Sequence, residues 1–237
     1  MHQYFVDNLT QGISYLSCDQ AHHLLRVLRN KVGDKLRIVY EGQPFLAEII
    51  EINPKVKLKI IESLNSINNH IFIRLLPALI KKDKWEWLIM KACEFGVSEI
   101  QPLVSDNCVV KISDDDDNKI ARWNKIALSA CQQCKRAEVV LVRQPVTLKE
   151  IGNYPAQLLI VAYEKENIDS SLKKLLQNNN FNSVNIVIGP EGGLSSSEHE
   201  YLTSLGYHSV SLGSRILRAE SASIFVLNCL DYEVNHA

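Results

Sequence analysis

The sequence has no apolar run that approaches the roughly 18 uninterrupted residues of a transmembrane helix, so we expect no membrane span. Its first residues also lack the basic and apolar stretches of a secretory signal peptide. Six cysteines scattered over 237 residues are typical of the reducing cytoplasm rather than of a disulfide-stapled secreted domain. These absences predict a cytoplasmic protein without a membrane partner.

Neither sign of charge is in excess, because the net charge is −1 at pH 7. No global basic field therefore indicates a nucleic-acid partner, and any RNA contact must come from a local patch. Residues 22–40 form one such patch, in which Arg26 and Arg29 are among five lysines and arginines against a single acid. Alone, this patch fits a solvated surface as well as it fits RNA binding.

Several catalytic motifs are also missing. The absence of a G-x-x-x-x-G-K-S/T phosphate loop excludes P-loop NTPases, and neither H-E-x-x-H nor G-x-S-x-G occurs. Cys131 and Cys134 have the spacing of a metal or redox pair, but they lie in a helical pattern with no second pair. We interpret them as structural thiols, with zinc or redox chemistry as the alternative. The four aspartates at 114–117 fit a solvated loop before a helix, so we predict no metal site.

The first part of the chain reads as a small β-rich module. Runs with strand character cover residues 3–6, 35–40, 44–52 and 55–61, and a helix capped by Ser17 or Asp19 is predicted over 18–29. The polar stretch 63–70 reads as a linker. We therefore place a domain boundary near 67, which gives domains of residues 1–67 and 68–237.

From residue 71 onward, strand-like and helix-like segments alternate. This alternation predicts an α/β fold with a mostly parallel sheet. The predicted strands are residues 71–79, 99–104, 139–142, 157–163, 184–188 and 210–212, and the predicted helices are residues 83–95, 118–135, 170–176, 197–205 and 219–234.

A glycine-rich segment at 188–193 follows a predicted buried strand. Its glycines allow a sharp turn and a close approach of backbone to ligand, while Pro190 stiffens the turn. Ser195 and Glu198 form an S-x-x-E capping box for the next helix, so Glu198 is interpreted as a cap. Spacing alone fits a structural strand–turn–helix connection at least as well as a ligand site. Glu191, inside the stiff part of the turn, is the stronger functional candidate.

A second segment at 212–222 joins a predicted strand to the closing helix. Gly213 ends the strand, and Arg215, Arg218 and Glu220 follow before the helix. Loops that leave the carboxyl edge of a parallel sheet are where α/β proteins bind ligands. The alternative without a functional role is that Arg218 and Glu220 are a surface ion pair.

Together the two glycine segments resemble those of the SPOUT-class, trefoil-knotted RNA methyltransferases. Within that class, the chain resembles over nearly its full length the 16S rRNA uridine-N3 methyltransferases of the RsmE type. The matching pieces are residues 22–29 with Gly33 and Asp34, 81–96, Arg122 and Trp123 with Gln133 and Arg136, 189–193, and 212–222. Each piece is weak, but five pieces in this order are specific.

The resemblance implies an N-terminal PUA-like β-barrel domain for RNA and a C-terminal trefoil-knotted SPOUT domain that binds S-adenosyl-L-methionine (SAM). It also implies a homodimer with each active site near the subunit interface. The implied reaction is SAM-dependent methylation of N3 of the uridine at position 1498, in helix 44 of 16S rRNA. The implied substrate particle is the assembled 30S subunit.

The resemblance also implies roles for individual residues. Arg218 is the candidate for stabilising the uracil anion, and Glu191 or Glu220 would orient the base or accept its proton. The residues expected to hold the cofactor are Leu76, Ile188, Gly189, Pro190, Gly192, Leu212, Gly213, Ile216 and Leu217. The residues expected to contact RNA phosphates are Arg26, Arg29, Lys81, Lys84 and Arg136.

Two departures from the family pattern stand out. The proline that usually follows the Arg136 region is absent, since residues 136–140 read Arg-Ala-Glu-Val-Val, and Ser221 stands where threonine is common. Serine keeps the hydroxyl, so we expect function to persist. Two alternative functions stay open: a SPOUT enzyme that modifies another RNA or another atom, and a non-catalytic RNA-binding module.

Overall fold

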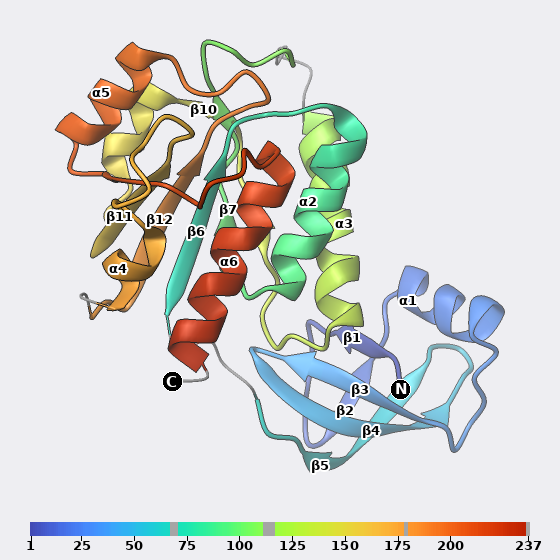
Figure 1. Ribbon diagram of the computed structural model, residues 1–237. Helices are drawn as coiled ribbons and strands as arrows, with labels where there is room; N and C mark the ends of the chain where they lie inside the picture. The colour runs from blue at the N-terminus through green and yellow to red at the C-terminus, as the bar shows by residue number, and fades with distance from the viewer. Residues whose placement is uncertain (67–70, 111–116, 178–179, 236–237) are drawn as a thin grey trace. The chain divides into compact units, whose positions relative to one another are not determined.

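The computed structural model describes the chain except residues 67–70, 111–116, 178–179 and 236–237. The chain divides into two compact units, Met1–Asn68 with Cys131–Val139, and Asn69–Ala130 with Val140–Ala237 (Figure 1). The boundary predicted near residue 67 and most of the aspartate run lie outside the described residues. Gln3 Nε2 donates to the carbonyl of Arg136 at 2.6 Å, a contact that ties the segment 131–139 to the N-terminal unit.

The N-terminal unit is built on a five-stranded sheet of order β1-β3-β4-β5-β2. Alternating side chains of β3, such as Leu36 and Ile38, are fully buried in one apolar core, as expected for a strand with one buried face. Strand β2 was not predicted, because three residues are too few for a periodic signal. The strands are β1 (Gln3–Phe5), β2 (Ile13–Tyr15), β3 (Lys35–Tyr40), β4 (Gln43–Glu51) and β5 (Lys57–Ser63).

The helix predicted over 18–29 is shorter and less regular in the structure. Helix α1 (Cys18–His22) passes directly into a π-helical turn, η1 (His23–Val27). Ser17 is the N-cap, with a full capping box to Gln20, which confirms one of the two predicted caps. Only Leu24 in η1 is buried, so this stretch contributes one anchor to the core and leaves Arg26 exposed.

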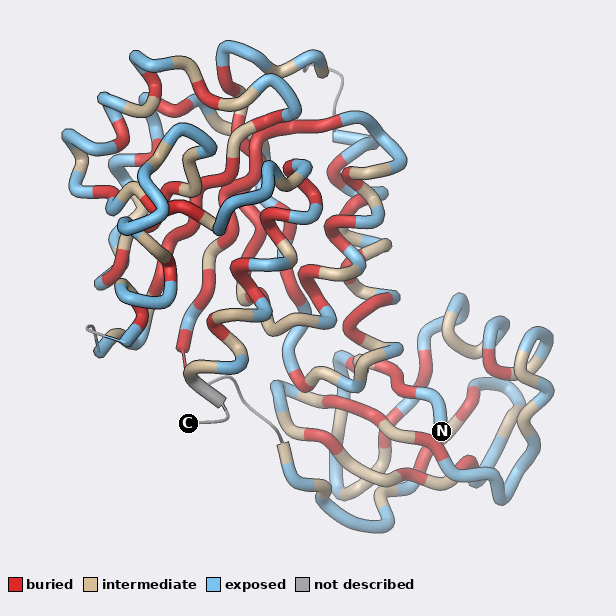
Figure 2. The backbone as a smooth tube through the Cα atoms, in the orientation of Figure 1, coloured by how far each residue is buried: buried red, intermediate tan, exposed pale blue. Residues whose placement is uncertain are grey.

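The C-terminal unit contains a six-stranded sheet of order β13-β11-β12-β6-β7-β9, and every pairing in it is parallel (Figure 1). This confirms the predicted parallel α/β sheet. Figure 2 shows buried residues running along its central strands, which have helices on both faces. The strands are β6 (Phe72–Pro77), β7 (Glu99–Ile100), β9 (Leu141–Val142), β11 (Leu158–Ala162), β12 (Ser183–Ile188) and β13 (His208–Val210).

The prediction of one strand over 99–104 was wrong. The segment splits into β7 and β8 (Leu103–Val104), and β8 pairs instead with β10 (Val146–Thr147). Pro102 lies between them, and proline has no backbone N–H to continue a ladder. Neither β10 nor the 3-10 helix η2 (Leu148–Asn153) was predicted, because both are too short for a periodic signal.

The helices of the C-terminal unit follow the predicted pattern to within a few residues. In α2 the buried residues recur at helical spacing, from Trp85 through Leu88 and Ile89 to Cys93, and this face packs against α6. On the other side, Leu202 of α5 belongs to a core cluster with strand residues. The helices are α2 (Lys82–Glu94), α3 (Asp117–Gln133), α4 (Leu172–Gln177), α5 (Ser196–Ser204) and α6 (Ala219–Asn235).

Within the described part of the chain, no helix is long and apolar enough to cross a bilayer.

Candidate active site

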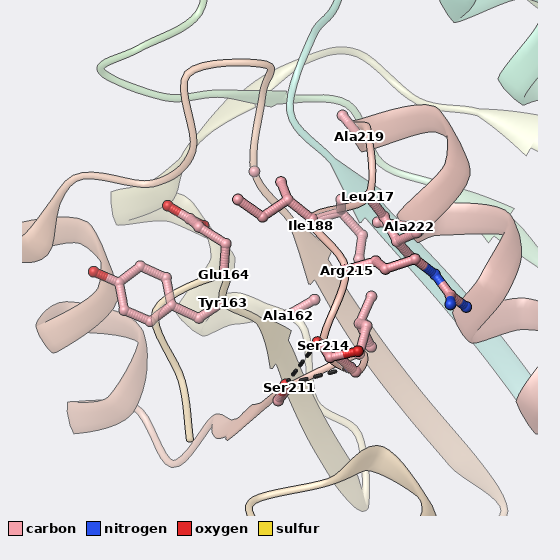
Figure 3. Close-up of a pocket in the computed structure, with 14 residues that line it drawn as sticks. Ala162, Tyr163, Glu164, Ile188, Ser211, Ser214, Arg215, Leu217, Ala219 and Ala222 are labelled. Atoms are coloured by element: carbon pink, nitrogen blue, oxygen red, sulfur yellow. Dashed lines mark hydrogen bonds between the residues drawn. The ribbon is translucent and has the colours of Figure 1, made fainter. Parts of the chain in front are cut away.

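The two glycine segments meet at the carboxyl edge of the parallel sheet. Strands β11, β12 and β13 end there, and the loops that follow them enclose one pocket (Figure 3). Because these strands are neighbours in the sheet, their following loops converge although they are far apart in sequence. The pocket is lined by Ala162, Tyr163, Glu164, Ile188, Gly189, Ser211, Leu212, Gly213, Ser214, Arg215, Ile216, Leu217, Ala219 and Ala222.

The turn at 189–193 leaves no space for side chains at two of its glycines. A Cβ on Gly189 would lie 3.1 Å from both Cγ and N of Leu194, so Leu194 would have to shift by a few tenths of an ångström. Gly193 has φ +72°, a conformation that glycine adopts without strain, and its N–H donates to the carbonyl of Pro190 at 2.9 Å. The glycines therefore fix a tight backbone at the pocket wall.

The helix behind this turn is capped as predicted. Ser195 Oγ accepts from the Glu198 N–H at 3.3 Å, and Glu198 Oε2 accepts from the Ser195 N–H at 2.8 Å. Glu198 has a further role that spacing could not reveal, because its Oε1 accepts from the Asp106 N–H at 2.8 Å. Ser195 Oγ also donates to Asp106 Oδ2 at 2.8 Å. The buried Glu198 carboxylate thus joins the loop after β8 to the start of α5.

Asn107 braces the same turn from outside. Its Nδ2 donates to the carbonyls of Gly192 at 3.3 Å and Gly193 at 3.0 Å. A Cβ on Gly192 would lie 3.1 Å from the Asn107 Cβ, so the two backbones are in close approach. Sequence reasoning missed Asn107, since nothing in a lone loop asparagine signals a contact so distant in sequence.

Two residues just after β11 were also missed, although Tyr163 ends a predicted strand and Glu164 follows it. Figure 3 shows Tyr163 and Glu164 at the pocket wall. Glu164 Oε1 lies 2.5 Å from where a Cβ on Gly193 would be, so this carboxylate packs closely on the turn. The Tyr163 ring stacks on His199, with centroids 3.9 Å apart, and His199 Nε2 lies 2.8 Å from Ser209 Oγ.

The β13–α6 loop supplies the opposite wall. Ser211 Oγ accepts from the Gly213 N–H at 3.3 Å, which tightens the start of the loop (Figure 3). Further along, the Ile216 side chain is 86 % exposed beside the half-buried Leu217. Both residues line the pocket, so this loop contributes apolar side chains to it.

Most residues predicted to hold a cofactor lie at this pocket, and three do not. Leu76 is fully buried in the core cluster beneath it, and Pro190 and Gly192 belong to the turn but are not among the lining residues. The predicted residues that line the pocket are Ile188, Gly189, Leu212, Gly213, Ile216 and Leu217.

A charged hollow adjoins the pocket and shares Ile216, Leu217 and Ala219 with it. The predicted catalytic residues Arg218 and Glu191 line this hollow together with Lys84. A further hollow beyond it contains Lys84 and Arg218 again, with Asp83, Trp87, Glu220 and Ser221.

The charged groups around these hollows have specific partners. Lys84 Nζ lies 3.6 Å from Glu220 Oε1, while Glu191 Oε1 is 3.5 Å from the Lys81 backbone N–H. Glu191 and Arg218 are exposed, whereas Glu220 is buried. The predicted catalytic residues are therefore gathered around one lysine.

The five residues predicted to contact RNA divide between the units. Arg26 and Arg29 are exposed and Arg136 is half-buried in the N-terminal unit, while Lys81 is exposed in the C-terminal unit. Lys84 differs from the others, since it lies in the charged hollows. Their contact with phosphates stays a prediction.

The cysteine pair has the character of buried thiols. Cys131 is fully buried, and Cys134 Sγ donates to the Cys131 carbonyl at 3.8 Å. Burial chiefly raises the pKa of Cys134, which favours the thiol over the thiolate that a metal needs. Among the described residues, no three His, Cys, Asp or Glu side chains gather as a metal site.

One charged cluster lies elsewhere in the same sheet. Glu99 accepts from Arg74 Nε at 2.7 Å and from Arg143 Nε at 2.6 Å. Burial alone raises the pKa of Glu99, but the hydrogen bonds from both arginines outweigh it and hold the pKa below its ordinary value. Arg74 also bonds Asn185 Oδ1 at 3.1 Å and lies over the Tyr154 ring, so the cluster joins β6, β7 and β12. This arrangement indicates a structural role.

Comparison with known proteins gives a consistent result. The model of the RNA methyltransferase domain matches residues 68–231, and that of the RNA methyltransferase PUA domain matches residues 16–61. These matches confirm the predicted combination of a PUA-like domain with an α/β methyltransferase domain.

Individual relatives match over nearly their full length. The ribosomal RNA small subunit methyltransferase E of Mesomycoplasma hyopneumoniae is 31% identical, over 96% of this chain and 97% of its own. That of Bacillus subtilis is 31% identical over 98% and 97%. A solved Legionella pneumophila structure, described as a methyltransferase in complex with the bound cofactor SAM, has a TM-score of 0.86 and 28% identity, with 97% and 96% covered. The chain belongs to the ribosomal RNA small subunit methyltransferase E family.

Proposed function

We propose that this protein transfers the methyl group of SAM to N3 of uridine 1498 of 16S rRNA in the assembled 30S subunit. The observation that carries the proposal is the pocket formed where both glycine segments meet, with a charged hollow directly beside it. Relatives named as small subunit rRNA methyltransferases, and a relative with SAM bound, support the same reading.

The pocket fits an adenosyl cofactor. Gly189 lines the pocket without a side chain, which lets a ligand approach the backbone there. Ile188, Leu217 and Ala222 supply apolar contacts, and the backbone of the loop after β13 supplies polar groups. When bound, SAM supplies an electrophilic methyl group on a sulfonium.

The protein's task at the base is to make N3 nucleophilic. Uridine N3 carries a proton, so its anion, spread over N3, O2 and O4, must be stabilised while N3 is aligned with the methyl group. Arg218 is the candidate for this stabilisation, since its guanidinium is always charged, lines the hollow beside the pocket and can donate to a uracil oxygen that carries part of the negative charge. Glu191, exposed in the same hollow, is placed to orient the base.

The proposal includes a trefoil knot and a homodimer. A hollow between α4 and α6, lined by Leu172, Leu176, Phe225 and Tyr232, shares Leu212 with the cofactor pocket. Phe225 is 41% and Tyr232 70% exposed, which is costly for an uncovered surface. We infer that a second copy of the chain covers it, so that each active site lies near the interface. In the knot, the segments after β12 and β13 that line the pocket would form the threaded crossing.

RNA contact is assigned to both units. The phosphate contacts would come from Arg26, Arg29 and Arg136 of the N-terminal unit and Lys81 of the C-terminal unit. Such contacts position the protein on the RNA but do not read the base sequence. A cytoplasmic location follows from the substrate, because ribosomal subunits are there.

Mass spectrometry of 16S rRNA from a deletion strain tests the function. We expect the methyl group at N3 of uridine 1498 to disappear and to return with the wild-type gene. Retention of 3-methyluridine at 1498 would instead indicate an enzyme for another RNA or atom. Calorimetry with SAM tests the remaining alternative, because a non-catalytic RNA-binding module should not bind the cofactor.

A further inference from the structure

Lys84 occupies an unexpected position for a phosphate-binding lysine. It lies in the first turn of α2, and its side chain is one-third exposed. It lines both charged hollows, and Arg218 lines both of them with it. The hollow nearer the cofactor pocket is the one proposed to receive the uracil ring, so Lys84 lines the place proposed for the base.

Glu220 is the partner that places Lys84 there. Its Oε1 lies 3.6 Å from Lys84 Nζ. Among the described residues, its Oε2 is enclosed without any hydrogen-bond partner, and the residue is only 9% exposed. A carboxylate so enclosed is costly unless a cation compensates its charge. One oxygen therefore faces the lysine and the other is shut away from any substrate, which suits a positioning residue and not a proton acceptor.

The uracil anion needs more than one cation. Its charge is shared by O2, N3 and O4, with the oxygens on opposite sides of N3. The N3 lone pair must stay free for the methyl carbon, so a guanidinium can serve the oxygen on one side of N3 and leaves the oxygen on the other side without a donor. Lys84 and Arg218 line the hollow from different elements, the start of α2 and the loop before α6, so the two cations can serve different oxygens of a bound ring.

We propose that Lys84 is a second catalytic cation for the methyl transfer and that Glu220 positions it. This inference rests on the proposed function. In the step, the N3–H bond breaks, its proton passes to solvent water, and the anion is held between Lys84 and Arg218. The N3 electron pair then forms the bond to the methyl carbon as the carbon–sulfur bond breaks. The products are 3-methyluridine, S-adenosylhomocysteine and a proton.

The other charged groups that face Lys84 set the background of the test. They are Asp83 on its own helix, Glu191 from the turn after β12, and Arg218 and Glu220 around the start of α6. Removing Lys84 leaves Arg218 as the one cationic side chain among the described residues that line these two hollows. The N3 pKa of the bound uridine should then rise towards its value in water, because a nearby cation favours the anion.

The test compares Lys84→Met and Lys84→Arg with the control Lys125→Met, an exposed lysine of α3 in the same unit. Methyl transfer to 30S subunits from a deletion strain is measured against pH, together with the Kd values for SAM and for 30S at several salt concentrations. We expect Lys84→Met to lower kcat about 100-fold, with both Kd values within about twofold of wild type. The pH at which kcat rises, as the bound uridine loses its N3 proton, should move to a higher value. Lys84→Arg should recover most of kcat, and the control should match wild type.

Other outcomes would overturn the inference. A weaker Kd for 30S with a reduced salt slope and unchanged kcat would make Lys84 a phosphate contact. If Lys84→Met does not fold, Lys84→Gln and Glu220→Gln carry the test, and unchanged kcat and pH profile in both would refute it. If the wild-type protein methylates no uridine N3, the proposed function itself is wrong. If the wild type is active and the Lys84 variants are equally active, only this inference is wrong.

Discussion

Replacing Asn107 is expected to weaken SAM binding without unfolding the protein. The side chain is exposed and makes two hydrogen bonds, both to carbonyls of the turn at Gly192 and Gly193. A neutral hydrogen bond contributes about 0.5–1.5 kcal/mol net, and exposure favours the lower half of that range. Asn107→Ala therefore destabilises the ordered conformation of the turn by about 1–2 kcal/mol. With tenfold per 1.4 kcal/mol, the Kd for SAM should rise about 5- to 30-fold.

An aspartate at this position sharpens the prediction. Asn107→Asp keeps the shape but carries only acceptors, which would face the two carbonyl oxygens. Its Kd for SAM should exceed that of Asn107→Ala, while the melting temperature of both variants stays within a few degrees of wild type. Titration calorimetry gives the Kd, with the exposed Asn153→Ala as the matched control. Kd values of both variants within twofold of wild type would refute the claim that Asn107 orders the turn.

Three further predictions concern the turn, the sheet and the proposed interface. Gly189→Ala should weaken SAM binding measured by calorimetry, because its Cβ meets Leu194 at 3.1 Å at the pocket wall, and unchanged affinity would contradict the close-approach argument. Arg74→Met should lower the free energy of unfolding in urea by about 3 kcal/mol at pH 7, since it removes one partner of the buried Glu99. The pKa of Glu99 is lowered in the folded protein, so its ionised carboxylate stabilises the fold above the unfolded-state pKa of about 4.3. This stabilisation is lost as the pH falls through the folded-state pKa. Glu99→Gln should therefore make the free energy of unfolding less dependent on pH in this acidic range. Phe225→Glu should yield a monomer in sedimentation experiments, and an unchanged mass would argue against the α4–α6 hollow as the dimer contact.

Local chemistry made part of the site predictable from sequence. The capping box of Ser195 and Glu198 depends on two residues three positions apart, and the structure has it as predicted. The buried strand β12 was equally readable, because a short apolar run before a glycine turn is a local pattern. The family resemblance implied that the two glycine segments share one cofactor site, and the parallel sheet explains why they converge, since the carboxyl ends of its strands lie at one edge.

What could not be predicted depends on contacts between distant segments. Asn107 and the second bond of Glu198 connect the loop after β8 to the turn after β12, and periodicity carries no information about such pairs. Leu76 shows the opposite limit. Its apolar character fits a pocket wall and a core equally well, and no alternation along β6 could decide, because Leu75 and Leu76 on opposite faces are both fully buried. Pairing of Lys84 with Glu220 likewise required the packing of α2 on α6.

The central claim is that the pocket and the charged hollow beside it perform one methyl transfer to uridine N3. Its most direct test incubates purified protein with isotopically labelled SAM and 30S subunits that lack the modification, then maps the label by mass spectrometry of 16S rRNA fragments. Wild type should place one methyl group at N3 of uridine 1498, and Arg218→Ala should lower the rate at least 100-fold. Label at another atom or another nucleotide, or an Arg218→Ala variant as fast as wild type, would contradict the account.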